Sequence, residues 1–113
     1  MRKLQSKDVF NAMRAISKAN LKEELKPVLA KISENKMSIE DAGIEGILAV
    51  MEIFSAKKSE QAIYEVLAGP FEMTAKEVEE LDLNVMLDNL IQLAQENNLK
   101  RFFTLLEGMI STK

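Results

Sequence analysis

Apolar residues recur along the chain at intervals of three and four, which is the spacing of one face of a helix. The longest such run covers residues 42–56 and contains Ile44, Ile47, Leu48, Met51 and Phe54, interrupted by only two acidic residues. A helix that is apolar around most of its circumference is usually buried on several sides. We therefore expect 42–56 to be a buried central helix. It is shorter than the roughly 20 residues that a membrane span requires.

Two glycines, Gly43 and Gly46, lie in the first half of this run. Glycine is a poor helix former, so its presence in an apolar helix needs another reason. The absence of a side chain allows a neighbouring helix to come close, and this is the use that we predict for both residues.

Shorter amphipathic patterns fill the rest of the chain, and none alternates with the period of a strand. The predicted helices are 7–19, 21–25, 27–33 and 42–56, followed by helices that begin after Ser59, Thr74, Asp82 and Asn97. Together they predict an all-α fold, a compact bundle of about six or seven short helices around the central one. At 113 residues the chain suits a single helical domain, 1–113.

Helix boundaries follow from capping and helix-breaking residues. Pro27 should separate two short helices, since proline disrupts a helix interior, and Gly69–Pro70 should end the helix that follows Ser59. Thr74 with Glu77 forms a capping-box sequence. In the helix after Asp82, an inner face of Leu83, Met86, Leu87, Leu90, Ile91 and Ala94 is expected.

Composition excludes most active-site chemistry. The chain has no Cys and no His, which removes disulfides, thiolate metal ligands and the commonest general base. No phosphate-binding loop or EF-hand spacing is present. Adjacent carboxylates such as Glu79–Glu80 diverge on a helix rather than share a site. We therefore predict no catalytic, cofactor-binding or metal-binding residue, and no enzyme activity.

Charge is unevenly distributed along the chain. Residues 1–36 hold nine Lys/Arg against four Asp/Glu, and residues 37–113 hold six against fourteen. This asymmetry fits nucleic-acid contact by the basic part, head-to-tail self-association, or simply solvated helix faces. Pro27 would interrupt a recognition helix in 21–33, which argues against a helix-turn-helix. A small helical DNA-binding regulator that uses the basic N-terminal third is nevertheless kept as the alternative function, beside a general helical adaptor.

A protein-binding surface is the remaining expectation. Methionine is frequent, with seven residues, and its flexible side chain suits adaptable contacts. Phe71 and Met73 follow the Gly–Pro break beside acidic residues. Phe102 and Phe103 are adjacent, so on a helix one should enter the core while the other stays partly exposed. The candidate partner-binding residues are Phe71, Met73, Arg101 and Phe103.

Three segments, 4–10, 62–73 and 97–103, resemble tail assembly chaperones of long-tailed phages and prophages of Gram-positive bacteria. Their sequences are LQSKDVF, AIYEVLAGPFEM and NNLKRFF, and the resemblance extends in order and length over nearly the whole chain. It implies a small, helical, non-enzymatic protein that coats the tape-measure protein, keeps it from aggregating and helps to bring tail-tube subunits to it. The family supplies no catalytic residue to carry over.

The same resemblance implies where such a protein acts. It implies the host cytoplasm and absence from the mature virion, in agreement with the lack of an apolar signal-peptide region after Met1. Many members are also made in a longer form by a ribosomal frameshift, and this chain matches the short form. The expected partners are the tape-measure protein, the tail-tube protein and further copies of the chain, with neither a membrane nor a cofactor.

Overall fold

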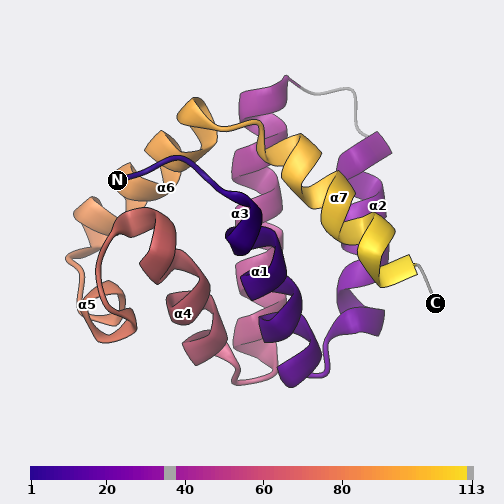
Figure 1. Ribbon diagram of the computed structural model, residues 1–113, viewed down its shortest axis with the longest axis horizontal. Helices are drawn as coiled ribbons and strands as arrows, with labels where there is room; N and C mark the ends of the chain where they lie inside the picture. The colour runs from indigo at the N-terminus through magenta and orange to yellow at the C-terminus, as the bar shows by residue number, and fades with distance from the viewer. Residues whose placement is uncertain (35–37, 112–113) are drawn as a thin grey trace.

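The computed structural model describes residues 1–34 and 38–111 and is all-α in that part of the chain (Figure 1). Its helices are α1 (Ser6–Lys18), α2 (Lys22–Glu34), α3 (Ile39–Ala56), α4 (Glu60–Phe71), α5 (Ala75–Glu79), α6 (Leu83–Glu96) and α7 (Leu99–Ser111). The described residues contain no strand. The predicted fold class, a bundle of about six or seven helices, is thus confirmed. The sequence Glu-Asn-Lys at 34–36 is typical of a loop, but 35–36 lie outside the described residues and Glu34 is the last residue of α2.

Helix α3 runs through the middle of the bundle and packs against α2, α4, α6 and α7 (Figure 1). Its central position agrees with the prediction, but its burial is less complete than expected. Ala42 and Phe54 are buried, whereas Leu48 is 54% exposed and Glu45 and Glu52 face solvent. The reason is that neighbouring helices cover only part of the helix surface, so the wide apolar stripe extends beyond the contact.

Both glycines of α3 are positions of close helix approach, as predicted. A Cβ added to Gly43 would lie 3.0 Å from the Cβ of Leu99. A Cβ added to Gly46 would lie 2.5 Å from a ring carbon of Phe103 and 3.1 Å from the Cδ1 of Ile32. The small residues therefore let α7 and α2 pack directly on the backbone of α3.

One hydrophobic cluster joins side chains from all seven helices. Within it lies a void of about 100 Å³ with an almost wholly apolar lining, contributed by α1, α2, α3, α4, α6 and α7. All the methionines in the described residues are partly buried, and five of them pack against this core: Met1, Met13, Met51, Met73 and Met86.

The prediction that Pro27 divides two helices is wrong, because α2 is continuous from Lys22 to Glu34. Proline removes one helical hydrogen bond, the one to the carbonyl four residues earlier. Here that carbonyl belongs to Glu23, an exposed residue, so water can replace the missing donor. The argument against a helix-turn-helix that rested on a broken second helix therefore does not apply.

Gly69–Pro70 likewise does not end α4, which continues to Phe71 with Pro70 inside it. The helix ends when Glu72 adopts a left-handed conformation, φ 59° and ψ 45°. The N–H groups of Glu72 and Met73 then donate to the carbonyls of Gly69 and Ala68, which is the Schellman pattern. Pro70 lacks the N–H that would donate to the carbonyl of Val66, so α4 continues through it with one helical hydrogen bond fewer.

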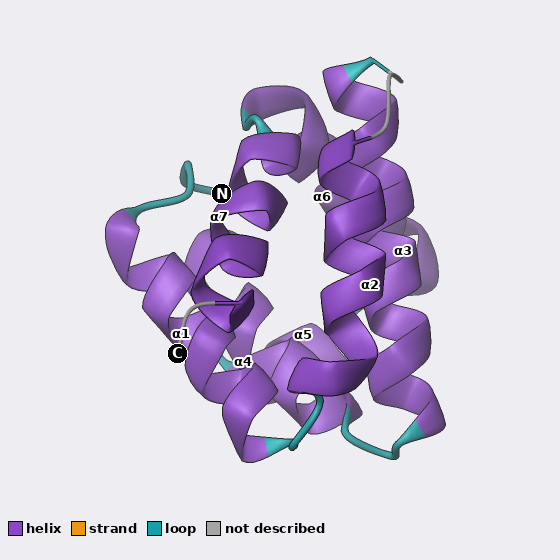
Figure 2. Cartoon of the chain, turned by 90° about the vertical axis from the view of Figure 1, so that its right-hand side faces the viewer, coloured by secondary structure: helices purple, strands orange, loops and turns teal. Residues whose placement is uncertain are grey.

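The same C-terminal motif ends α1 and α3, with Asn20 (φ 60°) and Lys58 (φ 56°) in the left-handed position. The gap between the predicted helices 7–19 and 21–25, which falls at Asn20, is therefore confirmed. Figure 2 shows the short loops that result, such as 19–21 and 57–59. The turn at 57–59 is followed by direct packing of α4 against α3.

Predicted N-terminal caps are also present. The hydroxyl of Thr74 accepts from the N–H of Glu77 at 3.1 Å, and the N–H of Thr74 donates to the Glu77 carboxylate at 2.8 Å. Asp82, also a predicted helix start, accepts from the N–H of Asn84. The sequence Ser38–Asp41 is a further capping pattern, and the Ser38 hydroxyl accepts from the N–H of Asp41. These contacts fix the start of α5, α6 and α3.

Candidate interaction surface

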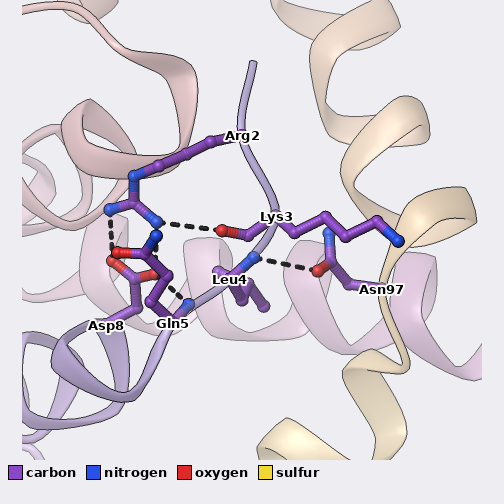
Figure 3. A network of polar contacts seen from close by, with 6 residues as sticks. All are labelled: Arg2, Lys3, Leu4, Gln5, Asp8 and Asn97. Atoms are coloured by element: carbon purple, nitrogen blue, oxygen red, sulfur yellow. Dashed lines mark hydrogen bonds and ion pairs between the residues drawn. The ribbon is translucent and has the colours of Figure 1, made fainter.

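Residues 2–5 are held against the bundle by a network of hydrogen bonds and an ion pair (Figure 3). The guanidinium of Arg2 donates to both carboxylate oxygens of Asp8, at 2.8 and 2.9 Å. The backbone N–H of Gln5 donates to the same carboxylate at 2.7 Å, and that of Leu4 donates to the side-chain oxygen of Asn97 at 3.0 Å. These bonds tie residues 2–5 to the first turn of α1 and to the link between α6 and α7.

Two further contacts hold the start of the chain against the end of α4. The N–H of Arg2 donates to the carbonyl of Pro70 at 2.9 Å, and the terminal amine of Met1 lies 3.0 Å from the carboxylate of Glu72. A Cβ on Gly69 would come within 2.8 Å of the Arg2 guanidinium. Gly69 therefore makes room for Arg2, a role that the sequence pattern, read as a helix stop, did not reveal.

Asp8 is a buried charged side chain with 1% of its surface exposed. Burial alone would raise the pKa of Asp8, but the hydrogen bonds from Arg2 and Gln5 and the positive charge of Arg2 together hold the pKa of this carboxyl below its ordinary value. Arg2, in turn, has a raised pKa because of its bond to Asp8. Both oxygens of Asp8 accept hydrogen bonds from residues 2–5, so the pair fixes the position of the N-terminal segment.

Two of the predicted partner-binding residues are core residues instead. Phe71 is 4% exposed and Phe103 is 5% exposed. Phe71 remains in α4, because this helix does not stop at Gly69, and so it turns inward. Phe103 packs on Gly46 of α3. Neither ring can meet a partner unless the bundle opens. Met73 is half-buried and Arg101 is exposed, so these two keep some accessible surface.

The roles of the two adjacent phenylalanines are thus the reverse of those assigned from the sequence. Phe103 is buried, and Phe102 is the partly exposed one, its ring 5.8 Å from that of Phe103 in an edge-to-face arrangement. Arg101, Phe102 and Leu105 line a shallow depression on α7, which we call the α7 patch. It is one candidate contact surface.

A second candidate surface lies on the first half of α6. Leu83 is 79% exposed and Leu87 is 50% exposed, although the pattern placed both on the inner face. The buried residues of α6 are Leu90, Leu93 and Ala94, all in its second half. The first half therefore extends beyond the core, and its apolar side is left uncovered. We call Leu83 and Leu87 the α6 leucine surface.

Carboxylates surround this surface in the sequence. Residues 72–88 carry six Asp/Glu against one Lys. Glu79, Glu80, Asp82 and Asp88 are all exposed. The surface thus combines two exposed leucines with several negative charges, which the assignment of these leucines to the inner face did not predict. The acidic residues before Leu83 were the sequence signal that could have indicated an exposed surface.

The described residues hold no group of His, Cys, Asp or Glu that could bind a metal ion. None of the described helices is long and apolar enough to cross a membrane. Comparisons with known protein families, curated proteins and solved structures give no match. The two candidate surfaces are therefore inferred from the geometry of this chain alone.

Proposed function

We propose that this protein is a non-enzymatic tail assembly chaperone that binds the phage tape-measure protein and assists tail-tube assembly. The observation that carries the proposal is the α6 leucine surface, in which Leu83 and Leu87 are exposed beside acidic residues. Apolar side chains left uncovered next to one another favour a protein contact. A chaperone that prevents aggregation of its partner needs an apolar surface to cover the apolar residues of that partner.

Two further features support this function. The half-buried methionines at the core margin can change rotamer and so adapt the surface to varied apolar sequences. The resemblance of segments 4–10, 62–73 and 97–103 to tail assembly chaperones supplies the identity of the partners, the tape-measure and tail-tube proteins. The expected place of action is the host cytoplasm, before the virion is complete, with self-association through the oppositely charged halves of the chain.

Co-expression with the tape-measure protein encoded downstream tests the proposal. The tape-measure protein should remain in the supernatant and co-purify with this chain, and should be insoluble when expressed alone. If it stays insoluble with this chain and also with any frameshifted longer form, the function is refuted. Leu87→Ser on α6 should reduce this co-purification, whereas Leu105→Ser on α7, which removes a leucine of similar exposure, should not.

The alternative, a DNA-binding regulator, rests on a specific observation. Lys7, Arg14 and Lys18 are exposed on α1, as are Lys22, Lys26 and Lys31 on the continuous helix α2. Fluorescence anisotropy with duplex DNA distinguishes the two functions. A regulator would bind with an affinity that falls steeply as salt rises, whereas the chaperone should show no binding at physiological salt.

A further inference from the structure

We propose that the α6 leucine surface and its carboxylates bind an amphipathic helix of the partner whose apolar stripe is flanked by lysine or arginine. This inference rests on the proposed function, because it specifies which chemistry a segment of the tape-measure protein must present. It assigns the contact to α6 rather than to the α7 patch.

The spacing of the leucines selects a helical occupant. Leu83 and Leu87 are four residues apart, so they lie on one face of α6 about one turn from each other. Met86 and Ile91, both partly buried, continue the apolar surface toward the core. A partner helix with apolar residues at intervals of three and four can lay its stripe along these side chains, which is the usual helix-in-groove mode.

The exposed carboxylates near the α6 leucine surface favour a partner helix that carries basic residues. Glu79, Glu80 and Asp88 are exposed, and none of them takes part in an ion pair found among the described residues. Lys76 is the only cation between residues 72 and 88. A partner with cations beside its apolar stripe would be attracted to this end of the molecule and oriented on it, while an acidic helix would be repelled.

A designed peptide supplies the probe. A labelled helix of about 18 residues, long enough to form in contact with a surface, carries leucines at helical spacing and lysines elsewhere. A second peptide replaces every lysine with glutamate. Fluorescence anisotropy with the full chain should show that the lysine peptide binds at least about tenfold more tightly. Its affinity should fall when salt rises from about 50 to about 300 mM. Equal affinity of the two peptides would overturn the charge argument.

Variants locate the contact. The double variant Leu83→Ser, Leu87→Ser should weaken binding of the lysine peptide by about tenfold or more, because the peptide can no longer bury two leucine side chains. Leu105→Ser, which removes from the α7 patch one leucine about as exposed as Leu87, should leave the affinity unchanged. If Leu105→Ser weakens binding and the α6 variant does not, the contact is on α7 and the proposal is wrong.

A charge variant has its own matched control. Replacing Glu79, Glu80 and Asp88 by Gln or Asn should weaken binding and reduce its salt dependence. Replacing three exposed acids elsewhere changes the net charge equally and should have a smaller effect: Glu45, Glu52 and Glu65, all to Gln. Equal effects of the two triple variants would show that only overall charge matters and would contradict a local site.

The outcome of co-expression separates this inference from the proposed function. If the tape-measure protein binds the wild type and the Leu83→Ser, Leu87→Ser variant equally well, the function stands and the α6 site is wrong. If the lysine peptide binds through α6 but the tape-measure protein does not bind at all, the site stands and the function is wrong. If the wild type dimerises through α6 and the peptide cannot compete, the occupant is a second copy, which refutes the proposal.

Discussion

The close approach of α7 to α3 at Gly46 leads to a quantitative prediction for Gly46→Ala. The added methyl group would lie 2.5 and 2.9 Å from two ring carbons of Phe103. It would also lie 3.1 Å from Ile32, so the ring cannot move aside without another contact changing. Both neighbours are buried, and a rigid aromatic ring gives way less readily than the end of a flexible side chain.

The expected loss of stability combines two opposing effects. Insertion of a methyl group into a packed core costs about 1–3 kcal/mol, and the tightness of this contact places the cost near the upper end. Alanine in a helix is favoured over glycine by about 1 kcal/mol. The net loss should be about 1–2 kcal/mol, or roughly 4–8 °C in Tm for a chain of this length.

Urea and thermal unfolding followed by far-ultraviolet circular dichroism measure this loss, since the chain has no Trp. Gly108→Ala is the control, because its Cβ would meet nothing within 4 Å and it should gain roughly 0.5–1 kcal/mol. Addition of Phe103→Leu should recover part of the loss caused by Gly46→Ala. If Gly46→Ala is as stable as the wild type, the described packing of α3 against α7 is wrong.

Four further predictions concern the Arg2–Asp8 ion pair and the helix ends. Arg2→Met should destabilise the protein by about 3 kcal/mol, since it leaves buried Asp8 without its cation; urea unfolding measures this. The pKa of Asp8 is lowered on folding, so its contribution to stability is full at neutral pH and is lost as pH falls below about 4. Asp8→Asn should therefore reduce the fall in the free energy of unfolding at acid pH. An unchanged fall would show that Asp8 does not cause it. Lys58→Gly should raise stability by about 1 kcal/mol, because lysine is strained at φ 56°, while Lys57→Gly, at φ −98°, should give no gain in the same assay. Thr74→Ala should cost about 1 kcal/mol by removal of the capping box, and a midpoint equal to that of the wild type would contradict this.

Periodicity and capping were sufficient to predict the helical architecture. The N-caps at Thr74 and Asp82 and the break at Asn20 depend on interactions within a few residues, so sequence alone determines them. The close approach at Gly46 was also predictable, because a glycine in an apolar helix has few other uses. Both prolines were misread for a shared reason. Pro27 and Pro70 each remove only one hydrogen bond, and both helices continue through them.

Burial was the part that the sequence pattern could not supply. An apolar stripe shows which side of a helix can be buried, but the length of the neighbouring helices decides how much of it is covered. Leu83 and Leu87 lie on the apolar side of α6 yet extend past the core. Phe71 and Phe103, which were placed on a contact surface, are covered by helices distant in the sequence. The Arg2–Asp8 ion pair was also not predicted, because its partners lie six positions apart, one in extended chain and one in a helix.

Hydrogen–deuterium exchange on the complex with the co-purified tape-measure protein tests the central claim most directly, namely that the protein holds its partner on α6. The account predicts added protection in residues 79–91 on binding, with little change in α1 and α2. Protection confined to α1 and α2, or to the α7 patch, would contradict it.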